Sequence, residues 1–343
     1  MAIQSIKSRT LAVAILLPLL LSAQQNALAW GASGHRMISR MAVEHLPAEL
    51  PAFLRASTTV DMIGELGREP DRSKGTGNSH DRDLDPGHYV NLSDDSTIAG
   101  VLPIDPLPTT REDYDTALRA AGTNEYRIGF LPYSIIDGWQ QLKKDFAYWR
   151  ADVAAERMAK SRKDRAWFAR DRRLRELIIV RDLGYWSHFV ADSSQPMHVS
   201  IHHDGWGDFP NPQGYTAKKG FHAYFEGAFV ASSVKGGDVL AKLRPFRDCA
   251  CSIQVRTVAY LRETQAQLAP MYELEKAGAF SGDIAAGKEF VADRLAAAVA
   301  ELRDMIVDAW RASADASVGY PAVPLRDIES RKTYPLRPMQ GLD

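Results

Sequence analysis

The stretch DRAWFARDRRLRELIIVRDLGYWSHFVADSSQPMH, residues 164–198, decides the fold class of this chain. It predicts one long helix from Asp164 to Ser193. The helix is expected to end before Gln195, because a proline at position 196 disfavours helical geometry in the residue before it. Basic residues are mixed with acids from Arg157 to Arg181. We interpret this basic stretch as a solvated helix face with ion pairs between residues four apart.

Helical patterns also dominate the rest of the chain. Apolar residues recur at close to the helical period in four further segments, which predicts helices over residues 34–46, from 132 past 149, 253–268 and 286–312. Residues 78–110 and 205–220 are rich in glycine, proline and polar residues and are predicted as loops. Internal repeats, strand pairs and a glycine-rich phosphate loop are not evident. The predicted fold is therefore mainly α, a single-domain bundle of long helices with function at loops and helix ends.

Both ends of the chain differ from this pattern. Residues 1–29 are predicted to be a signal peptide, with Lys7 and Arg9 before an apolar run and a small-residue cleavage site at 27–29. Cleavage there makes Trp30 the new N-terminus, so a secreted or periplasmic protein is expected. No second apolar run is long enough to span a bilayer. Residues 317–343 form a proline-rich C-terminal tail, either extended over the domain or disordered.

Composition limits the classes of partner and of cross-link. The apolar fraction of 45% and charged fraction of 25% are ordinary for a globular protein. The formal net charge of −1 argues against a broad basic face for long duplex nucleic acid. Only Cys249 and Cys251 are present, and a disulfide between such close neighbours would close a small strained ring. We therefore expect no disulfide scaffold and consider metal ions better candidates for cross-links.

Residues of the types that bind metals recur at informative spacings. His188 and Asp192 are four residues apart on the predicted helix, so both side chains leave the same face. His222 and Glu226 repeat this spacing, and His198 follows the helix break, where a turn can aim it back toward the site. Imidazole and carboxylate are donors that zinc accepts.

Each of these features alone has an ordinary structural explanation. A lone histidine on an apolar helix face is usually a core residue, and an isolated His–Asp pair is usually a surface ion pair. Their combination in one exported chain favours a metal site. His45, His80, His202 and His203 receive no role, and the last two are expected to face solvent in a loop.

Four short stretches carry a resemblance to a known family. They are the Trp30-to-His35 opening, Gly87-His88-Tyr89-Val90, the run from His188 to His198, and His222-x-x-x-Glu226. Together they resemble the zinc-dependent phospholipase C and single-strand-specific nuclease superfamily, with a phosphodiesterase domain over residues 30–316. The resemblance implies three zinc ions in a mainly helical fold.

The resemblance also implies a ligand set for each ion. The first would be held by Asp71, His88, His188 and Asp192, and the second by His198, His222 and Glu226. The third would use the amine and carbonyl of Trp30 with His35, and Asp192 would bridge to it. The paired ions would activate a water molecule for attack on a phosphoryl group, with Asp71 orienting or deprotonating it. Asp61 and Asp81 compete with Asp71, which is favoured because residues 69–72 resemble the family's segment most closely.

The substrate is open between two classes, phospholipid and single-stranded nucleic acid. Glu226 stands where the zinc phospholipases carry Glu and the nucleases typically Asp, and the nuclease-type Gly-Gly-Asn and Asn-Leu-His sequences are missing. A phospholipase C-like hydrolase is therefore the first expectation. The alternatives are a single-strand-specific endonuclease with 3′-nucleotidase activity, which releases 5′-nucleotides, and an exported zinc-binding protein without catalysis. A monomer is expected, and most aromatic residues near the site are expected to be packing residues.

Overall fold

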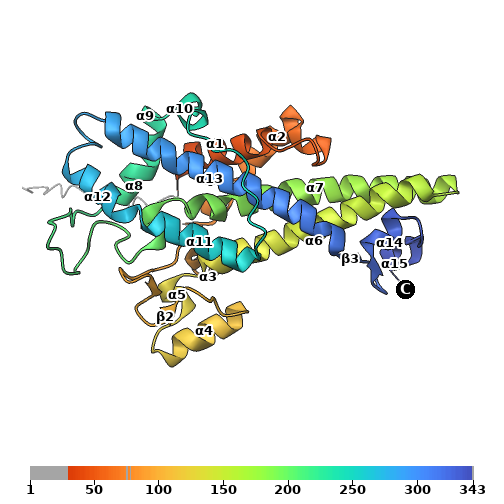
Figure 1. The fold of residues 1–343 in the computed structure, drawn as a ribbon, viewed down its shortest axis with the longest axis horizontal. Helices are drawn as coiled ribbons and strands as arrows, with labels where there is room; N and C mark the ends of the chain where they lie inside the picture. The colour runs from red at the N-terminus through yellow and green to blue at the C-terminus, as the bar shows by residue number, and fades with distance from the viewer. Residues whose placement is uncertain (1–29, 75, 78, 342–343) are drawn as a thin grey trace, which may run out of the picture.

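The computed structural model describes residues 30–341 except 75 and 78, and this part of the chain is mainly helical (Figure 1). The predicted signal peptide, residues 1–29, lies outside the described residues. The α-helices are α1 (Gly31–Glu44), α2 (Ser57–Leu66), α3 (Ser79–Leu84), α4 (Arg111–Ala120), α5 (Glu125–Ile128), α6 (Leu131–Met158), α7 (Arg162–Asp192), α8 (Phe221–Ala223), α9 (Val230–Ser233), α10 (Gly236–Leu240), α11 (Ile253–Gln265), α12 (Leu268–Lys276), α13 (Ala285–Ala312), α14 (Leu325–Glu329) and α15 (Leu336–Gln340). The short 3₁₀ and π turns are η1 (Ala52–Arg55), η2 (Pro70–Ser73), η3 (Asp85–His88), η4 (Pro196–Val199), η5 (Tyr224–Phe229) and η6 (Ser313–Asp315), and the strands are β1 (Thr97–Ile98), β2 (Leu102–Pro103), β3 (Ser317–Val318) and β4 (Val323–Pro324).

Two long helices, α6 and α7, form the axis of the molecule. They run side by side and project beyond the other long helices, at the right of Figure 1. The Ser161 hydroxyl caps α7 by accepting the N–H of Asp164 at 2.9 Å. The helix ends at Asp192, before Gln195-Pro196, as predicted. The mainly α fold class and the long helices expected from the sequence are confirmed.

Close contacts at two glycines set the packing around α7. A Cβ atom at Gly184 would lie 2.5 Å from Cβ of Leu66, and one at Gly138 would lie 2.0 Å from Cδ1 of Trp186. Glycine therefore lets α2 and α6 approach α7 closely. Helices α1 and α13 also pack on α7, and the buried apolar core between these helices includes Ile38, Leu183, Leu295 and Val299. This packing fixes the C-terminal end of α7 in the interior.

The structure adds elements in regions where the sequence predicts none. The predicted loop over 78–110 contains α3, η3 and the β1–β2 hairpin. Residues 317–341 contain the β3–β4 hairpin, α14 and α15 and lie against α6 and α7, where Val318, Leu325 and Ile328 are buried. The tail is therefore laid over the domain, but it is folded rather than extended. These pieces are too short to show a period of their own.

Cys249 and Cys251 form a disulfide, although the small ring that it closes was expected to be strained. Ala250 has a left-handed backbone with φ of 49°, and the two Cα atoms lie 5.1 Å apart, within the range that a disulfide spans. The bond closes a local ring and joins no distant segments. Among the described residues, no helix is both long enough and apolar enough to cross a membrane.

Candidate metal centre

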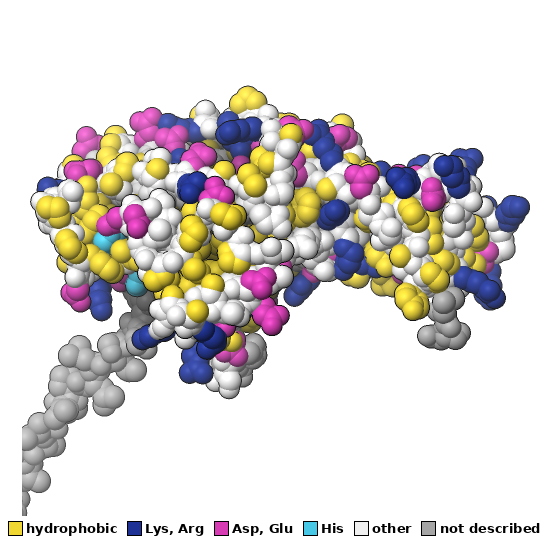
Figure 2. All heavy atoms as spheres, turned by 60° about the horizontal axis from the view of Figure 1, so that its bottom comes forward, with side chains coloured by type: hydrophobic (Ala, Val, Ile, Leu, Met, Phe, Trp, Pro, Cys, Tyr) yellow, Lys and Arg dark blue, Asp and Glu magenta, His cyan; other side chains and the backbone are white. Residues whose placement is uncertain are grey.

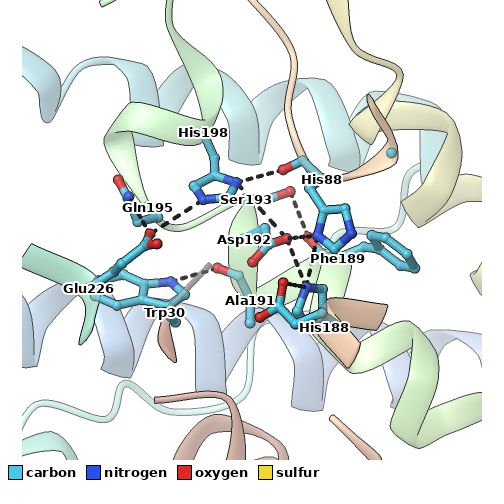
Figure 3. Close-up of polar contacts among 12 residues, drawn as sticks. Trp30, His88, His188, Phe189, Ala191, Asp192, Ser193, Gln195, His198 and Glu226 are labelled. Atoms are coloured by element: carbon cyan, nitrogen blue, oxygen red, sulfur yellow. Dashed lines mark hydrogen bonds and ion pairs between the residues drawn. The ribbon is translucent and has the colours of Figure 1, made fainter. Parts of the chain in front are cut away.

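The last turns of α7 carry the centre of a buried polar site. His188 and Asp192 are both inaccessible to solvent, and Nε2 of His188 lies 3.3 Å from Oδ2 of Asp192. The spacing of four residues places both side chains on one helix face, as predicted. Figure 3 shows Asp192 with His88 and His188 on one side and His198 on the other. The carboxylate of Asp192 therefore lies at the centre of the site, between these histidines.

A first group joins α7 to the two 3₁₀ turns that precede it in the chain. Asp71 from η2, His88 from η3 and His188 place ligand atoms within 4.8 Å of one another. Nε2 of His188 is 2.9 Å from Nδ1 of His88 and 3.7 Å from Oδ1 of Asp71. Oδ2 of Asp192 adds a second carboxylate, 3.1 Å from Nδ1 of His88. This is the four-residue set that the resemblance implies for one ion.

A second group lies where the chain turns after α7. His198 belongs to η4, His222 to α8, and Glu226 to the π-helical turn η5. Oε2 of Glu226 is 2.7 Å from Nε2 of His222 and 3.4 Å from Nε2 of His198. A π turn changes the spacing of side chains along a helix and is common at functional sites. These three residues form a second buried group that could hold a metal ion.

A third group uses the other oxygen of Asp192. Nε2 of His35, from α1, lies 3.4 Å from Oδ1 of Asp192, and the His35 and His188 rings stack at 3.9 Å. Oδ2 of Asp192 faces the first group, so the two oxygens face different groups, as a bridging ligand requires. Three buried groups that could hold metal ions therefore share one connected site.

Trp30 is placed next to this third group by its side chain. The buried indole donates to the carbonyl of Ala191 at 2.8 Å and contacts the Ser194 hydroxyl at 2.9 Å. Its carbonyl accepts the N–H of Gly34 at 3.1 Å. The tight turn has φ of 28° at Trp30 and 47° at Gly31, where a Cβ would lie 3.1 Å from the carbonyl oxygen of Glu226. The use of the Trp30 amine and carbonyl as metal ligands stays a prediction.

Buried polar atoms without a hydrogen-bond partner concentrate in this site. They include both ring nitrogens of His35, one oxygen each of Asp192 and Glu226, and Nε2 of His198 and His222. A buried polar atom without a partner costs about 1–3 kcal/mol. Several such atoms within a few ångströms of one another indicate cations that would satisfy them together. The residues therefore fit metal ions.

Backbone carbonyls orient three of the imidazoles for this role. Nδ1 of His188 donates to Gly67 at 2.8 Å, Nδ1 of His198 to His88 at 2.7 Å, and Nδ1 of His222 to His203 at 2.6 Å. In each case the proton is on Nδ1, so Nε2 carries a lone pair that faces the site and could bind a metal ion. Such outer hydrogen bonds fix the ring and its tautomer at metal sites.

Burial and charge shift the pKa values of the site residues in opposite directions. Burial, followed by the neighbouring His188, holds the pKa of His35 well below its usual range, and burial with Lys74 lowers the pKa of His88 to about 3. Burial opposes ionisation of Glu226, but His222 and His198 lower its pKa to about 2. Burial likewise opposes protonation of His198, but Asp192 and Glu226 raise its pKa to about 9. The buried carboxylates thus stay ionised and need positive charge beside them.

Two polar residues of the site were missed by the sequence analysis. Nζ of Lys74 lies 3.0 Å from Oδ1 of Asp71 and 3.7 Å from Oδ1 of Asp85, with only 14% of the side chain exposed. Gln195 donates to Oε2 of Glu226 at 2.9 Å. The i,i+3 spacing of Asp71 and Lys74 was the available signal for the lysine. Gln195 was part of the quoted run, but only the fold shows that it reaches Glu226.

The structure also separates Asp71 from its competitors. Asp61 is 61% exposed and pairs with Arg40, whereas Asp71 is buried beside His188. The side chain of Asp81 lies outside the described residues, as does that of His80. Among the described residues, Asp71 is the one that fits the first group.

His202 corrects one expectation, because it does not face solvent. It is fully buried, stacks on Trp206 at 3.7 Å, and its ring nitrogens contact the Trp206 carbonyl and Asp94. Trp206 and Tyr215 are buried packing residues, as expected for most aromatics there, whereas Phe209 and Tyr224 are 43% and 42% exposed. On the face drawn in Figure 2, histidine is visible only in small areas, in keeping with the burial of the site.

A pocket of about 240 Å³ lies beside the first group. Its lining includes Gly87 and Phe189, the chain neighbours of His88 and His188, and the rings of Phe130 and Tyr185. The His88 and Phe189 rings are in contact, 5.4 Å between centroids. A ligand bound in this pocket would therefore lie close to His88, with the ring of Phe189 between them.

No family model matches the chain, and no curated protein is significantly similar to it in sequence.

Proposed function

We propose that this protein is a zinc-dependent phosphodiester hydrolase of the phospholipase C and single-strand nuclease type. One observation supports the proposal most strongly: the two oxygens of Asp192 face two groups of buried ligand atoms, and Oδ1 of Asp192 and both ring nitrogens of His35 have no hydrogen-bond partner. The second group, at Glu226, lies next to them, with His198 3.9 Å from Asp192. Structural zinc sites are closed and isolated, whereas adjoining sites around one carboxylate are the arrangement used for phosphoryl chemistry.

The donor set favours zinc over harder cations. Imidazole nitrogens outnumber carboxylates, and calcium or magnesium would prefer oxygen ligands. When bound, zinc supplies a Lewis acid for the phosphoryl oxygens and lowers the pKa of a coordinated water molecule. The candidate ligands are Asp71, His88, His188, Asp192, His198, His222, Glu226 and His35, with the main chain of Trp30.

The chain's own residues have separable tasks in this proposal. Asp71, at the edge of the first group, accepts a proton from the attacking water or orients it. Lys74 holds Asp71 in place through their 3.0 Å ion pair and adds positive charge where a phosphate oxygen would bind. Gln195 and the carbonyl of His203 hold Glu226 and His222 in their positions. Burial of the whole set excludes water from competing hydrogen bonds.

Phospholipid is the substrate class we put first. Glu226 is the zinc phospholipase residue by resemblance, and the pocket beside His88 and His188 has an aromatic lining suited to an apolar group. Single-stranded nucleic acid is the second candidate, because Tyr89 follows His88 directly and is only half-buried, where its ring is available to a base. Export by the predicted signal peptide, which places the protein outside the cytoplasm, is part of the same proposal.

Parallel assays of the zinc-loaded protein on phosphatidylcholine and on a single-stranded oligonucleotide test this function. Release of phosphorylated headgroup, abolished by EDTA and restored by zinc, is the expected result. Oligonucleotide cleavage alone would move the assignment to the nuclease. Bound zinc without turnover of either substrate, or of bis(p-nitrophenyl) phosphate, would identify a non-catalytic zinc protein and overturn the proposal.

A further inference from the structure

Helix α7 has an exposed face that the metal centre does not use. Of its residues, ten are classed as exposed: Arg162, Lys163, Arg165, Ala166, Arg170, Arg173, Leu174, Leu177, Ile178 and Arg181. Six are cationic and four are apolar. Every Asp and Glu of α7 is at least partly buried, as when Glu176 pairs with Arg172 and Asp182 with Arg181. The face is thus basic and apolar without an exposed acid of its own.

The central residues of this face form a continuous stripe. Lys163, Arg170, Leu174, Leu177 and Arg181 follow one another at steps of seven, four, three and four residues, so they share one side of the helix. Leu174, Leu177 and Ile178 are 51%, 59% and 38% exposed. Clustered exposed aliphatic side chains of this size indicate a surface that is covered in use. We call Lys163, Arg170, Leu174, Leu177, Ile178 and Arg181 the α7 stripe.

The surroundings leave the α7 stripe open and positively charged. Helices α14 and α15 cover a different part of the α6–α7 arm, where Leu336 and Met339 pack near Phe168. The exposed acids of neighbouring α2, Asp61 and Glu65, are already paired with Arg40 and Arg36. On the face drawn in Figure 2, basic and acidic side chains are interspersed. Figure 1 shows the α6–α7 arm projecting beyond the other long helices, so this end of α7 stands clear of the main body of the molecule.

We propose that the α7 stripe docks this protein on an anionic lipid surface. A basic amphipathic helix lies in a membrane interface with its cations on phosphate headgroups and its aliphatic residues among the acyl chains. Leu174, Leu177 and Ile178 would contribute nothing to a nucleic-acid backbone, which rewards only the cations. The combination therefore favours lipid over nucleic acid.

The stripe also runs toward the metal centre. Arg181 stacks over Tyr185, 4.8 Å from guanidinium to ring centroid, and both line the pocket that ends at Gly87 and Phe189. Docking through α7 would bring the pocket mouth to the headgroup layer. Only this last link rests on the proposed function; membrane docking itself does not.

Vesicle sedimentation tests the proposal. The protein should begin at Trp30, because the apolar run at residues 11–21 would bind lipid by itself. We expect sedimentation with phosphatidylcholine vesicles that contain phosphatidylglycerol, weaker binding to pure phosphatidylcholine, and loss on raising the salt concentration. Phosphate release is followed in the same tubes, so that a failure of docking and a failure of hydrolysis are read separately.

Matched variants locate the surface. The double variant Leu174→Ser/Leu177→Ser should lower the vesicle partition coefficient about tenfold or more. The single variants Arg170→Gln and Arg173→Gln, the second at an exposed arginine beside the α7 stripe, should each lower it about fivefold. Leu240→Ser and Arg127→Gln, which change exposed residues on α10 and α5, should leave it unchanged. Equal binding by all variants would overturn the proposal. So would oligonucleotide binding that depends on the arginines alone, or a dimer that the leucine changes dissociate.

Discussion

At the scale of single residues, Asp192 is the side chain on which the site depends. Its oxygens lie 3.4 Å from His35 and 3.1 Å from His88, and the residue is fully buried. Asp192→Asn keeps the shape but removes the charge that two ions would share. We expect this variant to bind about one zinc ion in place of three and to hydrolyse substrate at least about 100-fold more slowly. Zinc analysis of the purified variant measures this, with Asp94→Asn as a control at an exposed carboxylate. Retention of all three ions would show that Asp192 does not bridge.

Lys74 gives a second prediction at this scale. Its ammonium is mostly buried, and although burial opposes its charge, Asp71, Asp192 and Asp85 raise its pKa. It therefore stays charged without being able to ligate a metal. Lys74→Gln should keep the zinc content and lower the rate about 10- to 100-fold. The control is Lys242→Gln, at an ion-paired lysine between α10 and α11, which should leave both the zinc content and the rate unchanged. A full hydrolytic rate in the Lys74→Gln variant would show that Lys74 does not contribute to catalysis.

At the scale of helices, Asp152 makes the α6–α7 pair sensitive to pH. Both carboxylate oxygens are buried without a partner, and burial, with the neighbouring Asp171, raises the pKa of Asp152 to about 8. The folded protein therefore binds a proton that the unfolded chain releases near pH 4. The part of the unfolding free energy that comes from this bound proton is fully present below about pH 4 and is lost as the pH rises toward 8.

The Asp152→Asn variant tests this linkage by denaturant unfolding. At pH 5 it should match the parent protein within about 1 kcal/mol, because a protonated carboxyl and an amide are similar. At pH 8 it should be more stable by about 2–4 kcal/mol. A difference that does not change with pH would show that Asp152 ionises normally in the folded state.

Helix packing gives a further prediction at the same scale. A methyl group at Gly138 would meet the Trp186 ring at 2.0 Å, so Gly138→Ala should cost about 1–3 kcal/mol of unfolding free energy. Gly237→Ala on α10 has nothing within 4 Å and should change it by less than about 1 kcal/mol. Equal thermal midpoints for the two variants would mean that α6 and α7 repack without cost.

The helices differ in how far the sequence could predict them. Apolar period and proline positions predicted α1, α6, α7, α11 and α13 to within a few residues, because long helices average many weak preferences. The π turn η5 and the short helices of the tail could not be found in this way, because a single turn is fixed by tertiary contacts. The same limit applies to the Cys249–Cys251 ring, which depends on the left-handed backbone of Ala250.

At the scale of the whole molecule, the site forms where segments distant in sequence meet. Spacing alone indicated His188 with Asp192 and His222 with Glu226, and the resemblance supplied His35, Asp71 and His88. The structure brings these seven candidate side chains, with His198, into three buried groups around the end of α7. Gln195 could not be assigned beforehand, because its partner Glu226 comes from another turn of the fold, whereas the spacing of Asp71 and Lys74 was a signal that the sequence analysis did not use. The open face of α7 was likewise predicted only as a solvated surface.

The decisive measurement is the zinc stoichiometry of the chain that begins at Trp30, compared with that of the same chain carrying one extra glycine before Trp30. We expect about three zinc ions per chain in the first protein, and about two in the second with slower hydrolysis, because the extension would remove the free amine next to His35 and Asp192. Equal zinc content and equal rates would exclude the terminus as a ligand. A first protein that binds no zinc would contradict the metal centre itself.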